Sequence, residues 1–342
     1  RYMNDEYKPL PSSIIAEGID CFGVAGDRGD VAMVGYGAAR YALASGNCNE
    51  AEKLWPLIEW CLEYCHRQLN ADGVVKSDSD ELENRFPAGK ANLCTSSLYY
   101  DALVSAAYLG KALKKEHKQI KSYQDRAAEL YKNIDAYFAR NVEGYDTYRY
   151  YDGNTVLRSW ICIPLTMGIY DQAKGTVEAL FSDKLWMENG LLTQSGTSTY
   201  WDRSTLYAFR GAYSCGARDI ATEYLDKYSA TRLLGDHVPY AVEAWPEGNQ
   251  RHLSTESALY CRIMTEGLFG IRPIALDAFM MTPQLPESWN TMSLKRICAF
   301  GSIFDIEVKR DKDDKLLVLI KKDHKIVKRS KITNGKPIEV RI

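Results

Sequence analysis

The chain lacks the sequence features of membrane-spanning and metal-binding proteins. None of its apolar runs reaches the roughly 18 residues of a membrane-spanning helix, so no membrane span is expected. Its 9 cysteines and 5 histidines include neither a Cys-x-x-Cys nor a His-x-x-x-His spacing, so we expect no metal and no cofactor. The opening Arg1-Tyr2-Met3 is not a basic-then-apolar leader, and no signal peptide is visible.

The chain also lacks the excess of positive charge that a polyanion-binding protein carries. Its 342 residues include 43 Lys+Arg and 45 Asp+Glu, a formal net charge of −2. From Glu287 onward basic residues outnumber acidic ones by 14 to 8, which leaves a net charge of −8 on residues 1–286. Nucleic acids and acidic polysaccharides bind to basic grooves, so we expect neither as a partner.

Up to about residue 275 the apolar residues follow a helical period. Residues 49–69, for example, place Leu54, Ile58 and Cys61 on one stripe at steps of three and four. The other predicted helices are 30–45, 93–114, 120–140, 168–181, 203–213, 217–228 and 254–269. Short turns alternate with long loops rich in Gly, Asp, Asn and Tyr, at 71–92, 143–156, 190–202 and 234–253. A ring of helical hairpins, with short turns on one face and long loops on the other, produces this alternation.

At Pro283-Gln-Leu-Pro286 the pattern changes from helical to β. Residues 292–342 contain strand-like segments separated by turn signals such as Asn334-Gly335, which indicates a small antiparallel unit. We therefore predict a mainly α protein with two domains. Residues 1–280 would form the ring of helical hairpins and residues 281–342 the C-terminal antiparallel β domain.

Three acidic clusters fall in or beside the long loops. In the first, Asp27-Arg28-Gly29-Asp30, Asp30 is interpreted either as a helix N-cap or as a functional carboxylate. The second, residues 77–85, includes Glu81 and is mostly typical of a solvated loop. The third, residues 240–256, sets carboxylates among aromatic rings, an arrangement that suits sugars because their CH faces stack on rings while their hydroxyls bond to acids.

The order of several motifs resembles the six-hairpin (α/α)6 glycosidases, most nearly bacterial α-L-rhamnosidases and glycogen-debranching-type enzymes. The matching segments are Gly26–Asp30, Leu54-Trp55-Pro56, Asp72-Gly73, Glu243-Ala-Trp245, Ser254-Thr-Glu256, Gly267–Pro273 and Pro283–Pro286. The resemblance implies an (α/α)6 toroid that cleaves a glycosidic bond of an oligo- or polysaccharide with inversion. It further implies a periplasmic or secreted protein, and an N-terminal β-sandwich domain absent from this chain.

In such enzymes one carboxyl protonates the leaving oxygen and a second activates water, the two being roughly 6.5–9.5 Å apart. The resemblance assigns the acid to Asp30, with Asp27 as the alternative, and the base to Glu243. The predicted substrate-binding residues are Asp27, Arg28, Glu81, Trp201, Trp245, Glu247, His252 and Glu256. The sequence departs from the rhamnosidase pattern, since no Trp precedes Gly26 and Ala rather than Arg follows Glu243.

Two alternatives stay open. A phosphorylase on the same ring would use phosphate in place of water, and Arg251-His252-Leu-Ser254-Thr255 is a possible phosphate pocket. A glycan-binding protein without catalysis would keep the aromatic cleft alone.

Overall fold

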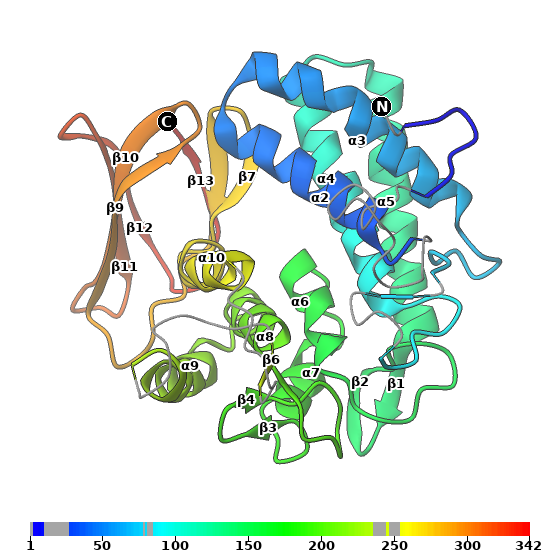
Figure 1. Cartoon of the computed structure of the whole chain (residues 1–342). Helices are drawn as coiled ribbons and strands as arrows, with labels where there is room; N and C mark the ends of the chain where they lie inside the picture. The colour runs from blue at the N-terminus through cyan, green and yellow to red at the C-terminus, as the bar shows by residue number, and fades with distance from the viewer. Residues whose placement is uncertain (1–2, 10–26, 78, 81–84, 235–243, 246–253) are drawn as a thin grey trace.

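A computed structural model describes residues 3–9, 27–77, 79–80, 85–234, 244–245 and 254–342. Helices dominate the chain up to residue 268, so the fold is mainly α, as predicted (Figure 1). The long helices are α2 (Asp30–Ser45), α3 (Cys48–Arg67), α4 (Leu93–Ala112), α5 (His117–Phe138), α8 (Asp202–Ser214), α9 (Arg218–Arg232) and α10 (Ser254–Arg262). No helix in these ranges is long and apolar enough to cross a membrane.

The predicted helix 168–181 is only partly correct. Helix α7 covers Ala173–Leu180, and a separate short helix, α6 (Ile163–Met167), precedes it after the 3-10 turn η1 (Ser159–Cys162). Every residue of η1 and α6 is buried, so this segment has no polar face and gives no helical period to read.

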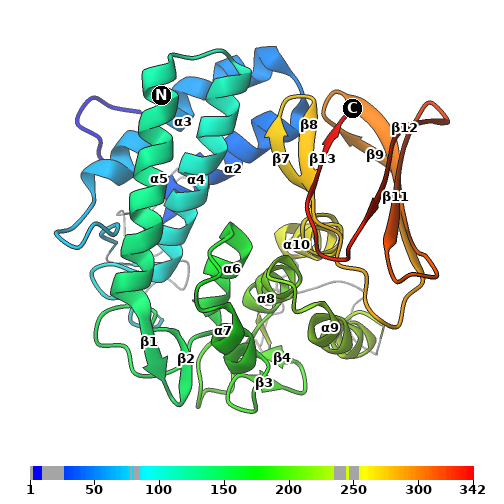
Figure 2. The ribbon, with the colours of Figure 1, turned by 180° about the vertical axis from the view of Figure 1, so that it is seen from behind.

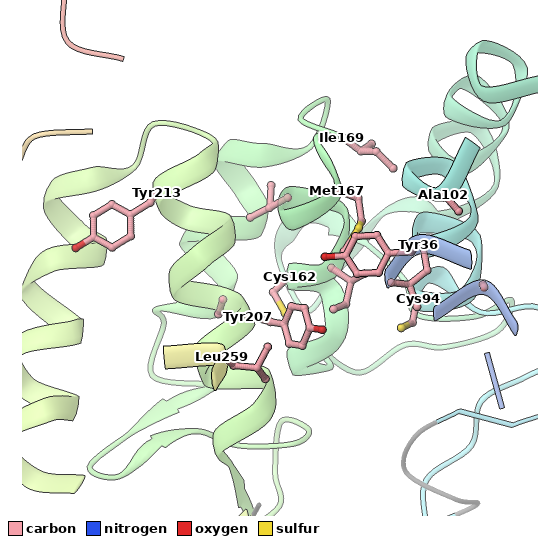
Figure 3. Close-up of a cluster of buried hydrophobic side chains, with 14 of the residues drawn as sticks. Tyr36, Cys94, Ala102, Cys162, Met167, Ile169, Tyr207, Tyr213 and Leu259 are labelled. Carbon is pink, nitrogen blue, oxygen red and sulfur yellow. The ribbon is translucent and has the colours of Figure 1, made fainter. Parts of the chain in front are cut away.

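The even-numbered helices α2, α4, α6, α8 and α10 pack against one another in chain order, and α3, α5 and α9 lie outside them (Figures 1 and 2). The inner and outer helices differ in how much of their surface is buried. The inner helix α4 is buried on nearly every side, whereas the outer helix α5 buries a single stripe, which includes Tyr123, Leu130 and Phe138. Figure 3 shows Tyr36, Cys162 and Tyr207, from three separate inner elements, in one buried cluster.

The C-terminal part is β, as predicted, and forms two antiparallel sheets. Strands β9 (Thr291–Ala299), β10 (Ser302–Arg310), β11 (Leu316–Lys322) and β12 (Lys325–Ile332) form one sheet in the order β12-β11-β10-β9. Strands β7 (Arg272–Ala275), β8 (Ala278–Met281) and β13 (Ile338–Arg341) form the other in the order β13-β8-β7. The second sheet therefore draws strands from both sides of position 281, and the domain boundary placed there stays a prediction.

Short two-stranded pairs lie in or beside the predicted long loops. They are the hairpins of β1 (Ala139–Val142) with β2 (Tyr145–Tyr148) and of β3 (Trp186–Met187) with β4 (Gly190–Leu191), and the long-range pair of β5 (Tyr200–Trp201) with β6 (Ala244–Trp245). The last pair joins two loops that are more than forty residues apart in the sequence, and so fixes the start of α8 to the chain that leads into α10.

Candidate active site at the loop face

The starts of neighbouring inner helices lie side by side. A Cβ added at Gly29, before α2, would lie 2.9 Å from the Thr95 hydroxyl in the first turn of α4. The Leu93 N–H, at the start of α4, donates to the carbonyl of Tyr150 at 3.0 Å, in the loop that leads to η1 and α6. The helices therefore begin at a common end.

Similar contacts join the starts of the remaining inner helices. The Ser159 N–H donates to the carbonyl of Thr193 at 3.1 Å, which lies in the loop before α8. Arg203 Nε, in the first turn of α8, lies 2.8 Å from Glu256 Oε1 in the first turn of α10. We call this end of the inner helices, with the long loops that lead into it, the loop face. The ring of hairpins predicted from the alternation of long loops and short turns stays a prediction.

At the start of α2 the structure brings two carboxylates and an arginine together. Asp27 Oδ1 accepts hydrogen bonds from the N–H groups of Gly29 (3.0 Å) and Val31 (3.3 Å). Gly29 occupies the N-cap position, so the interpretation of Asp30 as the N-cap is wrong. Asp30 Oδ2 lies 3.5 Å from Arg28 Nε instead, and both side chains are only partly exposed.

Asp27 differs from an ordinary surface aspartate in its affinity for protons. Burial raises its pKa to about 6, and the charge of Asp30 adds to the effect. Hydrogen bonds from Val31, Tyr64 and Gly29 oppose the shift without cancelling it. Asp27 is therefore half protonated near pH 6, and its pKa lies closer to neutrality than that of an exposed aspartate, which suits a general acid.

The predicted sugar-binding residues Trp201 and Glu256 meet through Arg203. The Arg203 guanidinium lies over the Trp201 ring, 5.9 Å from its centroid, and it pairs with the fully buried Glu256. Trp201 packs edge-on against Trp160 at 4.5 Å, and Trp160 against Tyr207 at 5.4 Å. Glu256 Oε2 has no hydrogen-bond partner in the described part of the chain.

Sequence reasoning missed a buried ion pair at the same face. Arg158 and Asp80 are almost fully buried, with Nη2 and Oδ2 3.7 Å apart. Arg158 also donates to the carbonyl of Pro87 at 2.9 Å and lies over the ring of Tyr150. Asp80 stands beside Glu81 in the acidic run, but nothing in the run singles it out, because its partner follows 78 positions later and belongs to no motif.

Four predicted site residues, Glu81, Glu243, Glu247 and His252, lie outside the described residues. Of Trp245 only the backbone is described, and it pairs with Tyr200. Within the described residues, no group of three or more His, Cys, Asp and Glu side chains is arranged to hold a metal ion.

No protein-family model and no curated protein matches the sequence. Solved structures match the fold. A protein named Sialidase superposes with a TM-score of 0.68 and 15% identity, over 89% of this chain and 32% of its own. The GH78 family rhamnosidase of Bacillus sp. GL1 superposes with a TM-score of 0.56 and 13% identity, over 91% and 33%. This chain has the fold of an α-L-rhamnosidase.

A second α-L-rhamnosidase, from Dictyoglumus thermophilum, superposes with a TM-score of 0.52 and 13% identity, over 87% of this chain and 37% of its own. The predicted likeness to rhamnosidases is thus confirmed for the fold. The chain spans about a third of the length of each of these three proteins.

Proposed function

We propose that this chain is the helical catalytic part of a glycoside hydrolase, with its active site at the loop face. The observation that carries the proposal is the pair Asp27 and Asp30, of which Asp27 keeps its proton to a higher pH than an exposed aspartate does, because burial raises its pKa to about 6. The partly exposed Arg203 guanidinium at the start of α8 adds a charged group of the kind that binds sugar hydroxyls, while its neighbours Trp201 and Glu256 are buried and hold it in place.

The arrangement of the helices supports an (α/α)6 toroid as the scaffold. Inner helices follow one another around the core, and side chains join the first to the last, since Arg40 on α2 binds Glu266 beyond α10 at 2.7 Å. We propose residues 1–280 as the toroid and residues 281–342 as the β domain.

In the proposed reaction a carboxyl at the start of α2, Asp27 or Asp30, protonates the glycosidic oxygen while Glu243 removes a proton from the attacking water. The raised pKa favours Asp27 as the proton donor over Asp30, the residue that the family resemblance named. Asp30, held by Arg28, would then accept hydrogen bonds from sugar hydroxyls. Direct attack by water inverts the anomeric centre.

A panel of aryl glycosides tests this proposal, with release of the aryl group as the signal. We expect hydrolysis of at least one member, and a loss of 100-fold or more in kcat on changing Asp27→Asn, on the order of what one acid contributes. Asp30→Asn measures how much the second carboxyl contributes to kcat. Asp72→Asn, at an exposed loop position, is the matched control. A kcat unchanged by Asp27→Asn would remove Asp27 from the mechanism.

Further readouts test the mechanism and separate the alternatives. Proton NMR of the first product identifies its anomer and so tests inversion. A Glu243→Gln variant with normal turnover would exclude Glu243 as base, because an amide cannot accept the proton of water. Faster sugar release on adding phosphate would indicate a phosphorylase, and sugar binding without turnover a glycan-binding protein.

A further inference from the structure

Four arginines and two carboxylates form a cluster where the inner helices meet the three-stranded sheet. They are Arg40 on α2, Asp101 on α4, Arg210 on α8, Arg262 on α10, Glu266 just beyond α10 and Arg272 on β7. We call this group the arginine cluster. It lies toward the ends of α2 and α8, and so on the side opposite to the loop face.

Both carboxylates of the arginine cluster are ionised, and each is bonded by two arginines. Asp101 accepts from Arg40 Nε at 2.8 Å and from Arg272. Glu266 accepts from Arg40 at 2.7 Å and from Arg262, with Arg210 at 3.7 Å. Burial opposes the charge on both acids, but the arginines outweigh it and hold both pKa values below the ordinary range.

The arginine cluster therefore carries four positive and two negative charges. The Tyr36 hydroxyl accepts from Arg210 Nη2 at 3.0 Å and from Arg262. Burial raises the pKa of this phenol, but the arginines lower it further, to below its ordinary value. Even with Tyr36 ionised, one positive charge stays uncompensated by the described residues.

Three of these arginines border a cavity of about 210 Å³. Its wall also carries the carboxylate Glu266, whose charge the arginines share, and the hydroxyl-bearing residues Thr166, Tyr170, Ser214 and Thr282. Arg210 is only 2% exposed, and its Nη1 has no hydrogen-bond partner in the described part of the chain. Burying an unpaired guanidinium N–H is costly, because it has lost its water without gaining an acceptor.

We propose that this cavity binds a tetrahedral oxyanion with the size and charge of phosphate or sulfate. Guanidinium groups present N–H donors that match the oxygens of such anions. The hydroxyls of Tyr170 and Thr282 can complete the shell, whereas those of Thr166 and Ser214 donate to the carbonyls of Ile163 and Arg210. The volume is sufficient, since one water takes only about 30 Å³ of liquid. Because Arg40 and Arg210 lie on helices while Arg272 lies on β7, the anion would hold the sheet to the helices.

Thermal unfolding of the full chain tests the site. We expect phosphate and sulfate each to raise Tm by about 2–4 °C over chloride at matched ionic strength, because they bind only the folded state. Titration calorimetry on the wild-type chain should give one phosphate per chain. A hexose phosphate separates two sources of the anion: a larger shift than with phosphate means that the anion is carried on a sugar.

The variant Thr282→Glu places a carboxylate at the cavity wall and should replace the anion. We expect its Tm in chloride to rise and its phosphate affinity to fall at least 10-fold. Thr282→Gln, of the same size but neutral, should respond to phosphate as the wild type does. The proposal is overturned if phosphate and chloride give the same Tm, if calorimetry detects no binding, or if the two variants respond alike. Failure of glycoside turnover would leave these readouts unaffected.

Discussion

At the scale of single residues, Asp27 shows how burial raises the pKa of a carboxyl and costs stability when the carboxyl is charged. Its oxygen is fixed by two backbone N–H groups, while its charge is opposed by burial and by Asp30. A raised pKa in the folded state means that the folded chain binds more protons than the unfolded chain between about pH 4 and pH 6. The stabilising contribution is complete at acid pH and is lost as the pH rises through 6.

Asp27→Asn should therefore stabilise the protein above pH 6 while it abolishes turnover. The amide oxygen can still accept from Gly29 and Val31, but it carries no charge to bury. We expect a gain of about 1–3 kcal/mol at pH 8 and little change at pH 4, measured by urea unfolding at both values. A variant less stable than wild type at pH 8 would contradict the argument.

The Arg203–Glu256 pair yields a second prediction at this scale. Arg203→Gln leaves the fully buried Glu256 carboxylate without its charged partner and should cost about 3 kcal/mol. Adding Glu256→Gln removes the buried charge and should restore most of the loss in urea unfolding. Lys227→Gln, which breaks the exposed pair with Glu223, is the control and should have no measurable effect. Equal losses of stability in the single and double variants would show that lost packing, and not the unpaired charge of Glu256, causes the loss.

At the scale of elements, helices with one polar face could be predicted from the sequence, and so could the long buried helices α4 and α8. Short buried segments could not. The stripe of α3 predicts its position to within two residues at each end. Helix α6 and the strands β7 and β8 lack such a contrast, because their residues are buried or partly buried on both sides. In the same way, the acidic run identified a loop but not the buried Asp80 within it.

Two glycines, one within α2 and one at its C-terminal end, test the contact between α2 and the β part of the chain. Gly46 ends α2 with φ +69°, and a Cβ there would collide with the backbone of Phe300 and Gly301. Gly46→Ala should cost about 2–4 kcal/mol in chemical unfolding. Gly37→Ala, at an exposed helical position with nothing within 4 Å, should instead stabilise the chain by about 0.5–1 kcal/mol. If both changes destabilise equally, contact with the β part is not the cause.

At the scale of the whole molecule, the order of the helices and strands along the chain could be predicted. The contacts between distant loops at the loop face could not. Alternating long loops and short turns predicted which segments share a face. The contacts that join them, such as Trp201 with Ala244, depend on residues far apart in sequence and leave no local signal. The likeness to rhamnosidases therefore fixes the scaffold, while the roles of Asp30 and Glu243 stay predictions.

Strand β13 suggests how the two parts of the molecule depend on each other. It pairs with β8 along its length and buries Val340 completely, while β7 of the same sheet carries Arg272 into the helices. A chain that ends at Lys336 should lose about 3 kcal/mol or more, and calorimetry should show the helical part melting earlier as well. Arg341→Gln, at the exposed ion pair with Asp277, is the control and should leave Tm unchanged. Independent melting of the helices would contradict the coupling.

The π-helical turn at Ile263–Leu268 continues α10. It determines in which direction the side chains of this turn and of the residues after it point. Its wider hydrogen bond, from the Phe269 N–H to the carbonyl of Met264, accommodates one residue more than an α-helical turn would. Since each helical residue turns the chain by about 100°, deleting one residue here would rotate Glu266 away from Arg40 and Arg210. Chains of the same fold without this turn should therefore align with it only across a one-residue gap, with their equivalent of Glu266 displaced by one position.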